Sequence, residues 1–244
     1  MARRGQSLTR AASEQRTARA SARLGLTLRS VLVAPLAGFE SAFNVAERRA
    51  RVGRHPAEGF APFVVAAFGG AALLLLWLKV GGLLGLRDSA GADFRWAYLG
   101  TILILGALMS LTGQCLWGVA GRYSAHVLGG AALARDLRTV WGASSFPHVF
   151  ALAFLLPLDL IIVGPATFTT DRLTDPLARA WAAVSVALAV SFALWSGWLF
   201  VRGVQAATRL HGWRALVATA VATGCLTAAV ALPLVLLTVT GGAG

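Results

Sequence analysis

Long apolar runs separated by short charged segments make up most of this chain. Two of them, residues 61–78 and 97–121, contain no Asp, Glu, Lys or Arg, and the same is true of residues 180–201 and of everything from Ala215 onward. A helix needs about 20 apolar residues to cross a hydrocarbon core of about 30 Å. The pattern therefore predicts an all-α fold, a polytopic membrane bundle of five transmembrane helices. We expect these spans at roughly 61–85, 97–121, 146–169, 180–202 and 214–239.

The third run is unlike the others because it carries ionisable groups and prolines. His148 lies near its start and Asp159 lies deeper, two residues after Pro157. An Asp near the centre of a membrane helix costs about 2.5–3.5 kcal/mol to insert, so Asp159 should face the inside of the bundle. Pro157 lacks the N–H that an α-helix needs, which predicts a helix break there. The pattern leaves open whether Asp159 is structural or functional.

Lys79, near the end of the first span, is a candidate partner for Asp159. Both spans run in the same direction, so the two side chains could reach the same depth. We therefore hypothesise a Lys79–Asp159 ion pair; the alternative is that Lys79 extends to the membrane surface by itself.

The second span has small or polar residues at every fourth position: Gly106, Ser110, Gln114 and Gly118. Such a ridge favours a helix-packing seam, because small residues let two backbones approach and Gln can hydrogen-bond across the contact. The alternative is a polar pathway lining. Together, Asp159, Lys79, Gln114 and His148 form the candidate intramembrane polar site.

The region before the first span divides into two parts. Residues 1–23 are rich in Arg, Ala and Ser and predict a disordered basic tail. Residues 26–51 place apolar side chains every three or four positions, which predicts an amphipathic helix with a kink at Pro35. This helix either lies in the membrane interface or docks a partner helix. The expected domains are thus 1–23, 24–58 and 59–240, with a second, short surface helix at about 131–141 between two spans.

The distribution of basic residues predicts the orientation of the chain. Of 22 Lys and Arg residues, 17 fall on one side of the predicted spans and 4 on the other. Since basic loops are retained in the cytoplasm, the N-terminus should be cytoplasmic and Gly244 outside. Six tryptophans near span ends predict aromatic belts at the two interfaces: Trp96, Trp117, Trp141, Trp181, Trp198 and Trp213.

The charge distribution and the Cys and His content indicate which partners and cofactors to expect. The net charge of +12 is collected outside the spans, half of the basic residues preceding residue 59, so we expect anionic lipid head groups at the N-terminus and no nucleic acid. Cys115 and Cys225 lie in spans and are expected to be buried apolar thiols. No Cys or His spacing suggests a metal, and we expect no cofactor.

Three stretches carry a resemblance to a known family. They are VLVAPLAGFESAF before the first span, SAHVLGGAALARDLRTVWGASSFPHVF with PLDLIIVG across the third, and WSGWLFVRGVQAATRLHGWRALVATAV across the fourth and fifth. Their order over residues 30–238 resembles the Yip-domain family of five-helix membrane proteins, named for Rab-GTPase interactors. The resemblance implies a cytoplasmic N-terminus, five spans and no catalytic residues.

This chain also departs from that family. The Asp-Leu-Tyr-Gly-Pro type motif of eukaryotic members has no counterpart in residues 1–60, so we do not expect Rab binding. Its 21 Arg against one Lys indicate a GC-rich bacterial genome and hence a bacterial inner-membrane protein.

Two functions compete. The first is a non-enzymatic protein that organises membrane or scaffolds partner proteins or lipids, alone or as a homo-oligomer. The alternative is a small transporter or channel component that uses the polar third span. An intramembrane enzyme is disfavoured because no nucleophile and base share a recognisable motif.

Overall fold

The computed structural model describes residues 30–51, 61–83, 96–164 and 175–241, with side chains placed for residues 30–44, 61–80, 99–164 and 175–228. The chain divides into two compact units, Met1–His55 and Pro56–Gly244. The described residues are helical and include no strand. The predicted basic tail, residues 1–23, lies outside them.

In the first unit, a helical turn at residues 30–33 is followed by α2, Pro35–Arg51. The helix is interrupted at Ala34, directly before the proline that predicts a kink. The backbone of Gly38 approaches this turn so closely that a Cβ at Gly38 would lie 2.7 Å from the backbone N of Val31. Phe39 and Phe43, one helical turn apart, stack with their ring centroids 6.2 Å apart. Residues 26–29 of the predicted helix lie outside the described residues.

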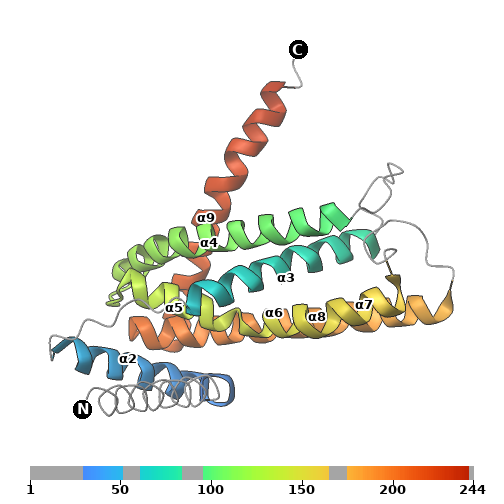
Figure 1. The fold of residues 1–244 in the computed structure, drawn as a ribbon. Coiled ribbons are helices and arrows are strands. Elements are labelled where there is room, and N and C mark those ends of the chain that lie inside the picture. The colour runs from blue at the N-terminus through green and yellow to red at the C-terminus, as the bar shows by residue number, and fades with distance from the viewer. Residues whose placement is uncertain (1–29, 52–60, 84–95, 165–174, 242–244) are drawn as a thin grey trace, which may run out of the picture. The chain divides into compact units, whose positions relative to one another are not determined.

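In the second unit, long helices lie side by side, and the C-terminal helix extends away from them (Figure 1). The elements of this unit in order are α3 (Ala61–Leu83), α4 (Trp96–Val127), α5 (Ala134–Ser144), α6 (Phe146–Phe150), the π-helical turn η1 (Ala151–Leu155), α7 (Leu156–Ile162), α8 (Pro176–Thr208) and α9 (Gly212–Gly241).

Four helical segments of the described residues are long and apolar enough to cross a membrane: Ala61–Val80, Leu99–Val127, Ala134–Ile162 and Pro176–Thr208. They correspond to the first four predicted spans. The predicted fifth span, 214–239, falls within α9, where the side chains beyond residue 228 lie outside the described set. That span stays a prediction.

The third span differs most from its predicted bounds, 146–169. It starts at Ala134 and ends at Ile162, because α5 leads through a single turn residue, Ser145, into α6. At its other end Gly164 has a φ of +68°, a left-handed conformation that suits glycine and ends helices. The surface helix predicted at about 131–141 is α5, which starts at Ala134 and ends at Ser144.

The expected surface helix is instead an internal one. Leu137 and Val140 of α5 are fully buried, and α5 packs against α3, α4 and α8. A Cβ at Gly142 would lie 2.3 Å from the carbonyl oxygen of Pro62, so only glycine lets α5 approach the start of α3 this closely. The amphipathic pattern identified the helix correctly, but its apolar face packs on other helices and not on lipid.

The predicted packing seam on α4 is confirmed. Gly106 lies against the backbone of Gly70 and Ala71 on α3, and a Cβ on Gly70 would lie 2.2 Å from the Cβ of Ser110. Gly118 lies against Arg138 of α5. The small residues thus let α4 pack against α3 and α5 at backbone distance.

Tryptophans divide between the interior and the surface. Trp117 is buried and forms an aromatic cluster with the half-buried Trp141 and with Phe200, so these two tryptophans pack against other aromatic side chains of the bundle. Trp198 and Trp213 are exposed, each beneath an arginine. The predicted burial of Cys115 and Cys225 is wrong: both thiols are free and lie on exposed helix faces.

Candidate functional site

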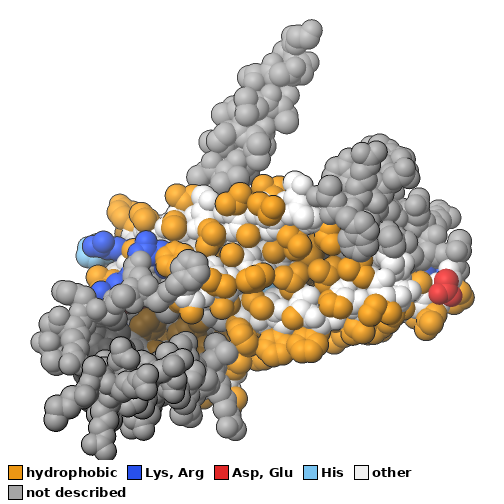
Figure 2. Space-filling model, viewed as in Figure 1, with side chains coloured by type: hydrophobic (Ala, Val, Ile, Leu, Met, Phe, Trp, Pro, Cys, Tyr) orange, Lys and Arg blue, Asp and Glu red, His pale blue; other side chains and the backbone are white. Residues whose placement is uncertain are grey.

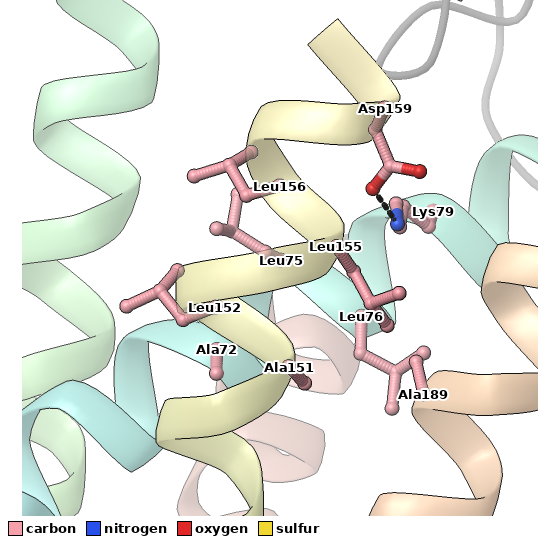
Figure 3. A pocket seen from close by; sticks show the side chains of 10 residues that line it. All are labelled: Ala72, Leu75, Leu76, Lys79, Ala151, Leu152, Leu155, Leu156, Asp159 and Ala189. Carbon is pink, nitrogen blue, oxygen red and sulfur yellow. Dashed lines mark hydrogen bonds and ion pairs between the residues drawn. The ribbon is translucent and has the colours of Figure 1, made fainter. Parts of the chain in front are cut away.

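Lys79 and Asp159 form an ion pair inside the bundle, as the sequence suggested. The Nζ of Lys79 on α3 donates a hydrogen bond to Oδ2 of Asp159 on α7 (Figure 3). The two residues are only 7% and 1% exposed, so both charges are held away from solvent and lipid. Two opposite charges in contact compensate much of the cost that each would have alone in a membrane.

Helix α8 supplies two further partners. Lys79 Nζ also donates to Oγ of Ser185 at 2.8 Å, and the indole N–H of Trp181 donates to Oδ1 of Asp159 at 3.1 Å. Trp181 and Ser185 are four residues apart, so they lie on one face of α8. The resulting four-residue polar cluster (Lys79, Asp159, Trp181 and Ser185) joins α3, α7 and α8.

A small cavity of about 30 Å³ adjoins the polar cluster. Apart from Lys79 and Asp159, its lining consists of Leu and Ala side chains from α3, η1, α7 and α8 (Figure 3): Ala72, Leu75, Leu76, Ala151, Leu152, Leu155, Leu156 and Ala189. Such a volume accommodates one or two water molecules, which would need hydrogen bonds from the charged pair. The cavity is therefore polar at one end and apolar elsewhere.

Pro157 does not break the third span, which corrects that prediction. The helix instead widens into the π-turn η1, Ala151–Leu155, immediately before the proline and then continues as α7. A proline has no N–H for the carbonyl four residues earlier, and its ring crowds that carbonyl; a π-turn is one way for a helix to absorb such a change. The widened turn lines the cavity and leads directly to Asp159.

Gln114 belongs to a different contact. It is completely buried, and its Nε2 donates to the carbonyl oxygen of Arg138 on α5 at 2.7 Å. Its Oε1 is buried without a hydrogen-bond partner among the described residues. Gln114 thus connects α4 to α5 and is not part of the polar cluster.

His148 is also separate from the polar cluster. It is buried in α6 and is not among the residues that line the cavity. α6 packs against α3 and α8. Of the four candidate polar residues, the fold brings together only Lys79 and Asp159.

Sequence reasoning missed Trp181 and Ser185. The sequence pattern places Trp181 in an interfacial belt, and Ser185 is not among the candidate site residues that it indicates; a serine within a membrane helix usually hydrogen-bonds to its own helix backbone. Ser191 does so, donating to the carbonyl of Ala187, whereas Ser185 accepts from Lys79 of α3 and Ser196 donates to the carbonyl of Ser144 of α5. The signal in the sequence was helical spacing. Ser185 belongs to a stripe of small residues that is buried on α8, and Trp181 precedes it by one helical turn. The buried stripe includes Ala178, Ala182, Ser185, Ala189 and Ser196.

The members of the polar cluster are hydrogen-bonded to one another. The ammonium has two acceptors, and each carboxylate oxygen has a donor. This arrangement suits a structural connection between helices, and the adjoining cavity gives the pair space to change partners.

Comparisons of the chain with family models, with curated proteins and with solved structures find no match.

Proposed function

We propose that this chain is a non-enzymatic integral membrane protein that organises membrane or scaffolds lipids and partner proteins. Its membrane domain would be a five-span bundle with a cytoplasmic N-terminus, as the Yip-domain resemblance and the charge distribution imply. The amphipathic helix α2 would be the element that contacts the membrane surface.

The observation that carries the proposal is the polar cluster that joins α3, α7 and α8. Lys79 and Asp159 satisfy each other and bind two side chains of α8, so they connect three helices in one bundle. Breaking a buried pair is strongly destabilising, whereas replacing both members together is often neutral. In a scaffold, the polar cluster would stabilise the fold by joining three helices and would take no direct part in the activity.

Helix α2 supports the membrane-contact part of the proposal. Its stacked Phe39 and Phe43 recur with helical spacing; Phe39 is buried and Phe43 half-buried, whereas Glu40 and Asn44 are exposed. A helix of this type lies in the interface with its apolar face about 5–10 Å deep and binds curved membranes more readily. Membrane organisation would follow from that insertion.

Vesicle curvature provides the test. The full-length protein, labelled with a fluorophore, is reconstituted into vesicles of mixed diameter, and its surface density is measured vesicle by vesicle. We expect the density to rise in smaller vesicles. Phe43→Glu should abolish this dependence because it places a charge in the apolar stripe. Asn44→Glu, which adds the same charge at an exposed position one residue away, should preserve it.

The double variant Lys79→Met/Asp159→Asn separates the scaffold from a transporter. It removes both charges, keeps similar shapes and leaves an oxygen for the Trp181 N–H. The scaffold proposal predicts an unchanged curvature dependence. Density that is independent of vesicle size in the wild type would refute it.

A second candidate, a small transporter or channel component, is favoured by the cavity. The cavity adjoins a buried ion pair and a π-turn, and irregular helices beside ionisable groups are typical of ion and proton pathways. Proton flux into proteoliposomes containing a pH-sensitive dye tests this candidate. Flux that disappears in Lys79→Met/Asp159→Asn would support transport, and a wild type no more permeable than protein-free vesicles would exclude proton movement.

A further inference from the structure

Two helix connections meet at one end of the second unit. The backbone N–H of Ala131, in the α4–α5 connection, donates to the carbonyl of Thr208 at the end of α8 at 3.2 Å. A Cβ at Gly130 would lie 2.8 Å from Leu210, so the two connections are in close contact. The buried Thr208 hydroxyl fixes the second connection by accepting from the N–H of Leu210. Side chains of both connections therefore present one continuous surface.

This surface, which we call the basic end, is rich in positively charged side chains. Blue Lys and Arg and pale-blue His side chains gather at this end in Figure 2. The exposed basic residues on the two connections and the adjoining helix ends are Arg122, His126, Arg209, His211 and Arg214. One acidic residue of these segments, Asp136, lies 3.5 Å from Arg135. The basic end thus has a clear excess of positive charge.

Arg209 has a backbone conformation that is unusual for a residue other than glycine. Arg209 ends α8 with a φ of +57°, and it is the non-glycine residue with positive φ among the described residues. The other connection meets the same conformational requirement with glycine, Gly129, at a φ of +82°. Glycine is the usual residue at such a helix end because it has no Cβ to strain. Arg209 therefore occupies a conformation that usually favours glycine, and its side chain is exposed at this end.

Aromatic and apolar side chains next to the basic end resemble a membrane interface. Trp213 is 61% exposed and lies under Arg214, with the guanidinium carbon 5.5 Å from the ring centroid. Trp198 is similarly placed under Arg202 at 5.9 Å. Nearer the bundle centre, α4 and α8 expose Val119 and Leu194. Tryptophan lies at head-group depth and apolar faces lie against acyl chains.

We propose that the basic end is a binding site for the head group of an anionic phospholipid. Arginines bind phosphate through charge-assisted, bidentate hydrogen bonds. The exposed apolar faces of α4 and α8 would hold the acyl chains, which is why a lipid fits this surface better than a free phosphate or an acidic peptide. The site is separate from the basic tail and does not depend on the proposed scaffold function.

Headgroup photo-crosslinking in the full-length protein tests the site. The protein is reconstituted with a trace of phosphatidylglycerol that carries a photoreactive group, or with phosphatidylcholine that carries the same group, and crosslinked peptides are mapped by mass spectrometry. We expect phosphatidylglycerol to label residues 122–131 and 205–214 several-fold more than phosphatidylcholine does. Mapping by peptide distinguishes this site from the N-terminal tail.

The variant Arg209→Gly separates lipid binding from folding. Glycine adopts a positive φ without strain, so the melting temperature should stay equal or rise. Labelling of the two segments should fall about fivefold, which corresponds to the binding free energy of one arginine near an anionic surface. The matched control, Arg179→Gln, removes an exposed arginine at the start of α8, away from the basic end, and should leave the labelling unchanged.

Two results would overturn the proposal. Equal labelling by phosphatidylglycerol and phosphatidylcholine would mean that the basic end is a solvated face without preference for anionic lipid. Unchanged labelling in Arg209→Gly would mean that the guanidinium has no part in binding.

Discussion

At the scale of single residues, Lys79 and Asp159 are stable in the bundle because they are present together. Each charge alone would require insertion into a medium that cannot solvate it, at about 2.5–3.5 kcal/mol on insertion scales. The contact between them, with Ser185 and Trp181 as further partners, replaces the lost water. Either residue without the other leaves a buried, uncompensated charge.

This dependence predicts strong coupling in a double-mutant cycle. Lys79→Ala and Asp159→Ala should each lower the free energy of unfolding by about 3–5 kcal/mol, since each leaves a charge without its partner. The double variant should lose much less than the sum of the two single losses. Unfolding by denaturing detergent in bicelles, followed by tryptophan fluorescence, measures all four forms. Additive losses would show that the pair contributes no coupling.

At the scale of elements, the helices are held together by small residues in specific registers. Gly70 touches α4 through Gly106 and Ser110, while its neighbour Gly69 lies against Ser145 at the α5–α6 junction. One pair of glycines thus lets α3 pack closely on two sides. Such packing depends on van der Waals contact, because between membrane helices there is no hydrophobic driving force.

A glycine-to-alanine comparison tests the contact. Gly70→Ala should destabilise the bundle by about 1–3 kcal/mol, because the new methyl would lie 2.2 Å from the Cβ of Ser110 and α3 and α4 would have to separate. Gly197→Ala, on a face of α8 with no atom within 4 Å of the new Cβ, should be neutral or stabilising by up to about 1 kcal/mol. The same unfolding measurement decides this; equal effects of the two variants would contradict the packing seam.

At the scale of the whole molecule, the exposed side chains of the second unit are largely apolar. The orange surface in Figure 2 runs along the helices between the two ends. The exposed large apolar residues include Ile104, Leu108, Val119, Ile161 and Leu194, from three different spans. A surface of this kind suits contact with lipid, because exposing such a large apolar area to water would be unfavourable.

Cysteine reactivity tests this placement. Cys115 and Cys225 are exposed on the helix faces, so in a bilayer they should face lipid and not water. Since the thiolate is the reactive form and does not form in hydrocarbon, a charged, membrane-impermeant thiosulfonate should leave both unmodified in nanodiscs and modify both in denaturing detergent. A Tyr123→Cys variant lacking the native cysteines, at the exposed end of α4, should react in nanodiscs. Rapid modification of the native thiols in nanodiscs would contradict a lipid-facing position.

The sequence by itself determined the all-helical fold and the position of four segments that are long and apolar enough to cross a membrane. The hydropathy of a segment is the sum over its own residues. A run such as residues 61–78 therefore identifies a candidate span without knowledge of the helices that pack against it. The small-residue ridge from Gly106 to Gly118 predicted a contact for the same reason, since helical spacing places its members on one face. The Lys79–Asp159 pair was accessible because two intramembrane charges need partners.

Only the tertiary structure decided which residues meet. The rotation and depth of each helix depend on all its neighbours at once, and no local pattern contains them. For that reason Trp181 and Ser185 join the ion pair while Gln114 and His148 do not, and α5 is inside the bundle although its amphipathic pattern is equally typical of a surface helix. Pro157 required a change in the helix, but a π-turn rather than a break resulted, because packing on both sides holds the span continuous up to Asp159.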